Sequence, residues 1–178
     1  MDPLVAHQRA QDAFAAVLAG VTPAQLQDPT PCPDWTVWGV VDHLVGGNWR
    51  VAGEARATPT EVVDLIKAHA ESASAAQATF GGPDGLTRIY DIRIGSVPGS
   101  AFIGLRTTDA LVHAWDVAKA TGQPTDVDSD VAQAMLEMSR QRISPEFRGA
   151  GRPFGEEQAC PDERSAADQL AAFLGRET

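Results

Sequence analysis

An aspartate and a histidine stand four residues apart in the segment TTDALVHAWD, residues 107–116. At this spacing Asp109 and His113 lie on one face of a helix, one turn apart. The pair alone is ambiguous, because an exposed Asp–His contact contributes roughly a few tenths of a kcal/mol and is common by chance. The same residue types also bind divalent metals, and the pair would then need a further ligand.

The chain contains four histidines, and His43 is the other one in a strongly apolar helical segment, WGVVDHLVGGN. Taken alone, His43 is interpreted as a buried histidine whose ring nitrogens have ordinary hydrogen-bond partners. His7 and His69 have polar neighbours in the sequence. We therefore expect these two histidines on solvated helix faces.

Taken together, His43, Asp109 and His113 form a candidate His/Asp/His metal site. Helical bundles hold metals with side chains that project inward from facing helices, including a carboxylate and a histidine one turn apart. Three ligands leave a position open for water or a substrate atom, as in catalytic divalent sites. Imidazole with carboxylate suits zinc, nickel or iron(II) better than calcium or magnesium. Gly46 and Gly47, one turn after His43, would leave room beside the metal.

Four residues near these ligands each have a functional and a structural interpretation. Arg106 could anchor an anionic substrate or pair with an acid. Asp116 could orient the imidazole of His113 or be exposed. Trp49 and Trp115 could wall a pocket or pack in the core. The residues alone leave these alternatives open.

The elements that position these residues are predicted to be helices. The first follows Asp2 as cap and ends near residues 20–23. The proline-rich segment 22–35 predicts an extended connection, and Asp34 is expected to cap a second helix over about 35–54. Thr58-Pro59-Thr60-Glu61 fits a capping box that opens a third helix, which ends near Thr79.

The second half of the chain is predicted to hold three more helices. Residues 86–100 alternate in a way typical of a short strand or an extended arm. Helices are expected over 99–121, 128–143 and 164–174, with a Gly/Pro-rich loop over 144–163. The predicted fold class is therefore all-α, a bundle of four main helices with short additional C-terminal helices, in a single domain over residues 1–178.

Composition excludes several functional classes. The net charge of −10 argues against nucleic acid as a partner, and no apolar run reaches the ~20 residues of a membrane span. The N-terminus lacks the pattern of a signal peptide, so we expect a cytoplasmic protein. Cys32 and Cys160 are far apart without CxxC spacing, which indicates neither a disulfide framework nor a cysteine zinc site.

Three segments, TPCPDWTVWGVVDHLVGGN, GLRTTDALVHAWDVAKATGQP and ADQLAAFLGR, carry a resemblance to a known family. The chain resembles the DinB-like superfamily, and more narrowly its metal-binding branch related to the N-terminal domain of mycothiol-dependent maleylpyruvate isomerase. The resemblance implies a four-helix up-down-down-up bundle whose metal is held by His43, Asp109 and His113. It also implies a thiol cofactor of the mycothiol type and an actinobacterial source. The isomerase has glutamate where this chain has Asp109, and it carries an additional C-terminal domain with no counterpart in these 178 residues.

The leading functional hypothesis is a metal-dependent enzyme that uses mycothiol, or another low-molecular-weight thiol, in S-transfer or isomerisation. A metal lowers the pKa of a thiol that binds it, and the thiolate could attack an electrophilic substrate. Arg106 is the candidate substrate anchor, and no cofactor-binding residue is assigned. The alternatives are a metal-dependent hydrolase and a non-enzymatic metal-binding or stress-related protein. A homodimer through a bundle face is also left open, since no pattern singles out such a face.

Overall fold

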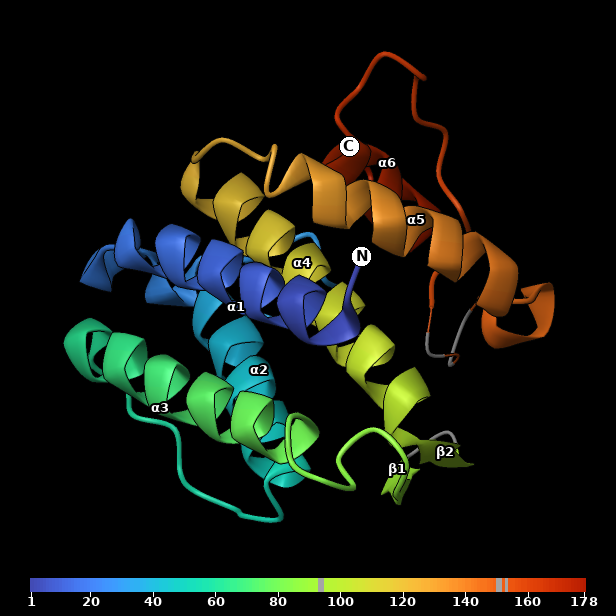
Figure 1. Ribbon diagram of the computed structural model, residues 1–178. Helices are drawn as coiled ribbons and strands as arrows, with labels where there is room; N and C mark the ends of the chain where they lie inside the picture. The colour runs from blue at the N-terminus through green and yellow to red at the C-terminus, as the bar shows by residue number, and fades with distance from the viewer. Residues whose placement is uncertain (93–94, 150–151, 153) are drawn as a thin grey trace.

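The computed structural model describes residues 1–92, 95–149, 152 and 154–178, which form six α-helices, two 3₁₀ helices and one β-hairpin (Figure 1). The helices are α1 (Pro3–Ala19), η1 (Pro23–Gln27), α2 (Val37–Val51), α3 (Val62–Phe80), α4 (Gly99–Thr121), α5 (Ser129–Arg142), η2 (Pro145–Phe147) and α6 (Ala166–Phe173). The strands β1 (Ile89–Ile92) and β2 (Gly95–Pro98) pair antiparallel, with Ile89 opposite Pro98.

Helices α1 to α4 form a bundle, and α5 and α6 pack beside it (Figure 1). Helix α1 packs against α3 and α4, and α2 packs against the same two helices. Helices α5 and α6 contact each other, and both contact α4. This arrangement confirms the predicted fold class, an all-α bundle with short additional C-terminal helices. None of the described helices has the length and apolar character needed to span a membrane.

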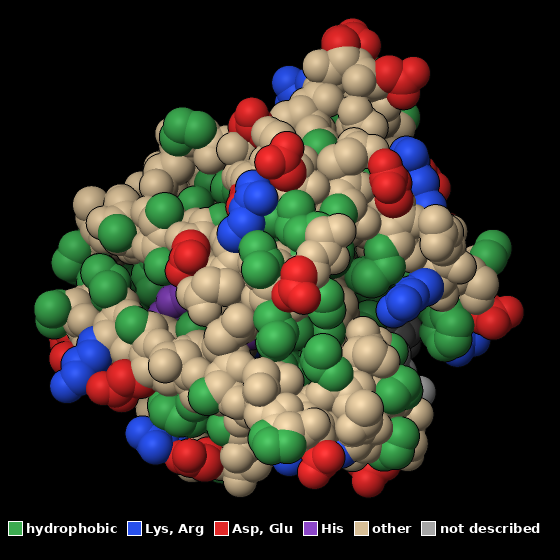
Figure 2. Space-filling view, viewed as in Figure 1, with side chains coloured by type: hydrophobic (Ala, Val, Ile, Leu, Met, Phe, Trp, Pro, Cys, Tyr) green, Lys and Arg blue, Asp and Glu red, His purple; other side chains and the backbone are tan. Residues whose placement is uncertain are grey.

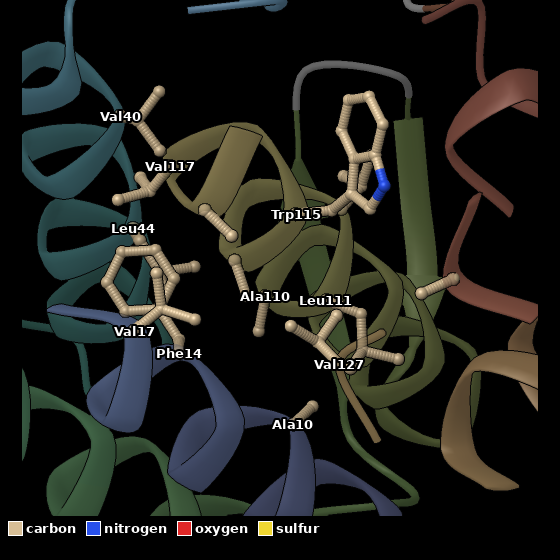
Figure 3. Close-up of a cluster of buried hydrophobic side chains, with 14 of the residues drawn as sticks. Ala10, Phe14, Val17, Val40, Leu44, Ala110, Leu111, Trp115, Val117 and Val127 are labelled. Atoms are coloured by element: carbon tan, nitrogen blue, oxygen red, sulfur yellow. The ribbon is translucent and has the colours of Figure 1, made fainter. Parts of the chain in front are cut away.

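Helix α4 lies at the centre of the molecule, and 15 of its 23 residues are buried. Its apolar side chains meet those of α1 and α2 in the main core, where Phe14, Leu44 and Trp115 are fully buried (Figure 3). The indole of Trp115 also donates to Asp168 Oδ1 at 2.7 Å. Because Trp49 is buried in the same core, the structural interpretation of both tryptophans holds. A helix surrounded in this way must find internal partners for its polar side chains.

The start of α2 differs from the prediction. Thr36 is the N-cap, and its Oγ1 accepts from the backbone N–H of Gly39 at 3.2 Å. Asp34 lies two residues earlier with a φ of 66°, in the left-handed region. The aspartate therefore forms part of the turn that leads into the helix, and the threonine hydroxyl satisfies one of the free N–H groups of the first turn, that of Gly39.

The predicted capping box does not open α3. The helix begins at Val62, and Glu61 is its N-cap without a side-chain hydrogen bond. The carbonyl of Pro59 accepts instead from the indole of Trp38 at 2.8 Å. This contact with α2 holds the segment outside the helix, which a local sequence pattern could not reveal.

The segment predicted as a strand or an extended arm forms the β1–β2 hairpin that leads directly into α4. Residues 93–94 of this segment lie outside the described residues, as do residues 150–151 and 153 of the predicted loop. The space-filling view shows acidic and basic side chains scattered over the visible face without a gathered basic patch (Figure 2). The lack of a basic patch on this face is consistent with the excess of acidic over basic residues, which gives the chain a net charge of −10.

The prediction that His7 and His69 lie on solvated faces is wrong, since their exposed fractions are 0% and 2%. The polar neighbours in the sequence lie on other helix faces, whereas both histidines face the contact between α1 and α3. His7 Nδ1 lies 2.6 Å from Gln77 Oε1, and His69 Nε2 lies 3.0 Å from Gln11 Oε1. Burial lowers the pKa of each imidazole to about 4, so both rings are neutral at pH 7.

Candidate metal centre

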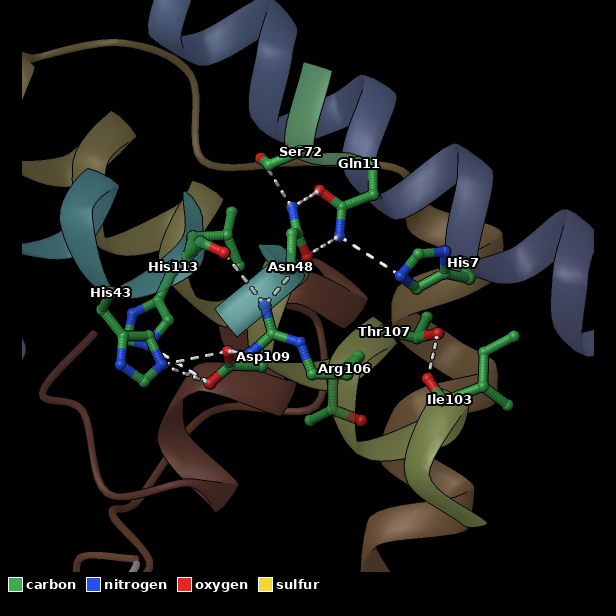
Figure 4. Close-up of polar contacts among 12 residues, drawn as sticks. His7, Gln11, His43, Asn48, Ser72, Ile103, Arg106, Thr107, Asp109 and His113 are labelled. Atoms are coloured by element: carbon green, nitrogen blue, oxygen red, sulfur yellow. Dashed lines mark hydrogen bonds and ion pairs between the residues drawn. The ribbon is translucent and has the colours of Figure 1, made fainter. Parts of the chain in front are cut away.

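The three predicted ligands meet between α2 and α4 (Figure 4). His43 comes from α2, and Asp109 and His113 come from α4; one donor atom of each lies within 4.8 Å of the other two. His43 Nε2 lies 3.3 Å from Asp109 Oδ1 and 3.1 Å from Oδ2. His113 Nε2 lies 3.4 Å from Asp109 Oδ1. The fold therefore brings together residues that are separated by 66 positions in the sequence.

These separations suit a single small divalent cation. A tetrahedral zinc with bonds of 2.0–2.1 Å places its ligand atoms about 3.3–3.4 Å apart. Asp109 Oδ1 lies 3.3 Å from His43 Nε2 and 3.4 Å from His113 Nε2, so these two separations match this geometry, and the third, between the two histidines, is within 4.8 Å. The side chains of His43 and Asp109 are 30% and 26% exposed, against 5% for His113. The site is therefore accessible from the side of His43 and Asp109.

The proline-rich connection between η1 and α2 covers one side of the imidazoles. The ring of Trp35 lies 4.6 Å from that of His43 and 5.5 Å from that of His113, measured between centroids. The thiol of Cys32 lies within 4.8 Å of donor atoms of His113 and Asp116. Burial raises the pKa of this thiol to about 11, so Cys32 is protonated at pH 7. Sequence reasoning missed both neighbours, because this segment has no periodicity that predicts its packing.

Arg106 holds Asp109 from inside the bundle. Its Nη1 donates to Asp109 Oδ2 at 2.5 Å, and its Nη2 donates to the Leu44 carbonyl at 3.2 Å and to Asn48 Oδ1 at 3.0 Å. Burial raises the pKa of Asp109, but the charges of Arg106 and His113 outweigh it and hold that pKa well below its usual range. Arg106 is 6% exposed, so the geometry favours its pairing with an acid over contact with a substrate.

Gly47 has a different role from the predicted one. A Cβ atom at this position would lie 2.5–2.7 Å from three atoms of the Arg106 guanidinium, which is too close for non-bonded atoms. A Cβ atom added at Gly46 would have Arg50 Nη1 as its nearest neighbour, at 3.4 Å, which is an ordinary contact distance. The missing side chain at position 47 thus makes room for Arg106, and the expectation that it leaves space for a ligand beside the metal is corrected.

The second ring nitrogen of His113 is held by Asp116. The two residues lie one turn apart, with His113 Nδ1 3.0 Å from Asp116 Oδ2. Arg176 in turn donates to both oxygens of Asp116, from Nε at 3.1 Å and from Nη2 at 2.9 Å. Burial lowers the pKa of His113, but Asp109 and Asp116 outweigh it and raise this pKa to about 9. The structure thus favours the orienting interpretation of Asp116, which is fully buried.

Replacing Arg176 with methionine is expected to reduce the free energy of unfolding of the metal-free protein by about 3 kcal/mol, because it leaves the buried carboxylate of Asp116 without its bidentate partner. Urea denaturation in the presence of a chelator measures this loss. Arg176→Lys keeps the charge but not the bidentate geometry, so an intermediate loss is expected. Wild-type stability in both variants would show that Asp116 does not depend on Arg176.

Comparisons with known proteins agree with the resemblance of the sequence. The sequence model of the mycothiol maleylpyruvate isomerase N-terminal domain matches residues 7–91. An uncharacterized protein of Mycobacterium tuberculosis, found in two strains, is 52% identical over 180 residues, which cover 99% of this chain and 98% of the relative. The chain belongs to the mycothiol maleylpyruvate isomerase N-terminal domain family. Of the candidate ligands, His43 lies within the matched residues of the family, and Asp109 and His113 lie beyond them.

A solved structure of the family has the same fold. The crystal structure of the mycothiol-dependent maleylpyruvate isomerase matches with a TM-score of 0.58 at 16% identity, over 80% of this chain and 72% of the isomerase chain. A histidine-to-alanine mutant of that isomerase matches with the same TM-score at 15% identity. At this level of identity the likeness establishes a shared fold and leaves the activity to be derived from the site.

Proposed function

We propose that this family member is a metal-dependent enzyme that uses a low-molecular-weight thiol, mycothiol, in S-transfer or isomerisation. The observation that most supports this function is the His43–Asp109–His113 cluster, whose donor atoms have the separations of a divalent metal site. Zinc is the first candidate and nickel or iron(II) are alternatives, because two imidazoles and one carboxylate suit these ions. The isomerase that shares the fold is mycothiol-dependent, which supports the choice of thiol.

In this proposal each described residue has a distinct task. His43, Asp109 and His113 would hold the cation, which supplies the Lewis acidity that lowers the pKa of a bound thiol. Arg106 keeps Asp109 ionised, and Asp116 holds the ring of His113 in a fixed orientation. Thiol and substrate would approach from the exposed side of His43 and Asp109, since the rest of the cluster lies against the bundle.

The two reaction types differ in the fate of the thiol. In S-transfer the sulfur either displaces a leaving group from an electrophilic carbon or adds to an activated double bond whose other carbon takes up a proton, and it remains in the product. In isomerisation the sulfur adds to one carbon of a conjugated double bond, the remaining single bond rotates, and the thiol is released when the carbon–sulfur bond breaks. A substrate for either reaction is therefore an electrophile with an activated carbon. The two reactions are distinguished by whether the product retains the thiol.

Metal content is the first test of the proposal. Protein purified without chelators, or reloaded with zinc, nickel or iron(II), is expected to bind about one metal ion per chain, as expected for a three-ligand site. His43→Ala and His113→Ala are expected to bind almost none, by elemental analysis. Thr107→Val is the matched control, because Thr107 is a buried polar residue of α4 outside the cluster and its variant should retain the metal. Absence of metal from the reloaded wild-type protein would contradict the proposed function.

The role of the thiol is tested with the metal-loaded protein. Rates are measured with and without mycothiol, for conjugation of a small electrophile and for cis–trans isomerisation of maleylpyruvate. A rate that depends on mycothiol and on His43 supports the proposal, and the product shows which reaction occurs. Ester or amide hydrolysis independent of mycothiol would instead support the hydrolase alternative. Bound metal without any rate would support the non-enzymatic alternative.

A further inference from the structure

A buried polar network crosses the bundle on the inner side of the metal centre (Figure 4). Its central residue is Asn48 of α2, which is fully buried. Asn48 Oδ1 accepts from Arg106 Nη2 at 3.0 Å and from Gln11 Nε2 at 3.2 Å. Asn48 Nδ2 donates to Gln11 Oε1 at 3.1 Å and to Ser72 Oγ at 3.4 Å. A single side chain on α2 thus links α4 to α1 and α3.

The orientation of the Asn48 amide follows from the chemistry of its neighbours. A guanidinium can only donate, so the oxygen of Asn48 must face Arg106. The amides of Asn48 and Gln11 then pair reciprocally, and Gln11 Oε1 also lies 3.0 Å from His69 Nε2. Every hydrogen-bonding atom of the Asn48 side chain therefore has a partner. A side chain satisfied in this way has little freedom to turn.

Arg106 is confined by this network on several sides. Asn48 and the Leu44 carbonyl hold Nη2, and Asp109 Oδ2 holds Nη1. The guanidinium also fills the space that a side chain at Gly47 would need. Nη1 engages Oδ2 of Asp109, which lies 3.1 Å from His43 Nε2. Oδ1 has no bond to the guanidinium, and it lies 3.3 Å from His43 Nε2 and 3.4 Å from His113 Nε2.

We infer that Asn48 is a positioning residue of the metal centre: through Arg106 it presents Asp109 so that the carboxylate binds the cation through Oδ1 alone. This inference rests on the proposed function. A carboxylate held in this way occupies one coordination position instead of two, which leaves more of the cation available to thiol and substrate. The hydrogen bond from the guanidinium occupies Oδ2 and so competes with binding of this second oxygen to the ion.

The test uses Co²⁺, whose visible absorption reports its coordination number, with affinity measured by chelator competition. Asn48→Leu removes the hydrogen bonds at similar volume, and Gly47→Ala displaces the guanidinium without altering Asn48. Both variants are expected to bind Co²⁺ about 10–100-fold more weakly, the usual effect of losing a group that supports a metal ligand. Their spectra are expected to shift toward a higher coordination number, because Asp109 becomes free to bind with both oxygens.

Thr107→Val is the matched control. The Thr107 hydroxyl is buried beside Arg106 on α4 and donates to the Ile103 carbonyl at 2.7 Å, outside the network (Figure 4). Its variant loses a buried hydrogen bond and should keep the wild-type affinity and spectrum. Wild-type affinity and spectrum in Asn48→Leu would overturn the inference and leave the metal site intact; an effect of Gly47→Ala alone would assign the positioning to Arg106 without Asn48. Failure of the wild-type protein to bind Co²⁺, Zn²⁺ or any other divalent ion would instead overturn the proposed function itself.

Discussion

Replacing Asp109 with leucine is expected to destabilise the metal-free protein by about 3–5 kcal/mol, the usual cost of leaving one partner of a buried ion pair uncompensated. The charge left behind is the guanidinium of Arg106, which is 6% exposed and loses its contact with Asp109 Oδ2. The same substitution is expected to abolish metal binding. Urea denaturation with a chelator present measures the first effect, and elemental analysis measures the second.

Two companion variants separate the ion pair from the metal site. Arg106→Met alone is expected to cost less stability than Asp109→Leu, because the Asp109 carboxylate that remains is 26% exposed and stays partly hydrated. The double variant, Asp109→Leu with Arg106→Met, should recover most of the lost stability, since apolar side chains can replace a buried ion pair. It should still bind no metal. If Asp109→Leu proved as stable as the wild-type protein, the buried positive charge of Arg106 would not depend on Asp109 for its stabilisation, and the prediction would be wrong.

Acidification from pH 7 to pH 4.5 is expected to reduce the stability of the protein by several kcal/mol. The imidazoles of His7 and His69 have their pKa lowered from 6.5 to about 4 by burial, so between these values the unfolded chain binds more protons than the folded one. Each histidine therefore contributes stability that is fully present above pH 6.5 and is lost as the pH falls toward 4. The loss is about 1.4 kcal/mol per pH unit and per histidine, and at most about 3 kcal/mol for each.

In the metal-free protein, the titration of His113 changes the free energy of unfolding with pH in the opposite direction. Its pKa is raised to about 9, so its contribution is present below pH 6.5 and is lost as the pH rises through 9. The free energy of unfolding is therefore expected to be greatest near pH 6.5. Urea denaturation between pH 4.5 and pH 9 gives this profile. Below pH 6.5, His7→Gln and His69→Gln should each reduce the slope of the free energy of unfolding against pH by the equivalent of about one bound proton. Thr107→Val should leave this slope unchanged.

The parts of the fold that could be predicted from the sequence are those determined by local patterns. Helix α4 begins at Gly99 and ends before Gly122, as expected, because Gly122 adopts a φ of 71° that few other residues tolerate. The relation of Asp109 to His113 follows from helical spacing alone. The start of α3 was not predictable, because it depends on the contact between Trp38 and the Pro59 carbonyl.

The contacts that surround the candidate site could not be predicted from the sequence, because each contact joins residues that are distant in the chain. Arg176 meets Asp116 across 60 positions, and Asn48 meets Arg106 across 58. Trp35 was missed because it lies in an irregular segment, against both imidazoles. The helical pattern identifies which residues can be ligands, whereas the side chains that orient them become evident only when the helices are packed together.

The close approach of Gly47 and Arg106 has a consequence for how this protein can change during evolution. A guanidinium occupies the volume that a side chain on α2 would otherwise fill. A larger residue at position 47 therefore requires a smaller one at position 106, and loss of the arginine removes the reason for the glycine. The two positions should vary as a pair among relatives, so glycine at one and arginine at the other would mark the lineages that retain this form of the site.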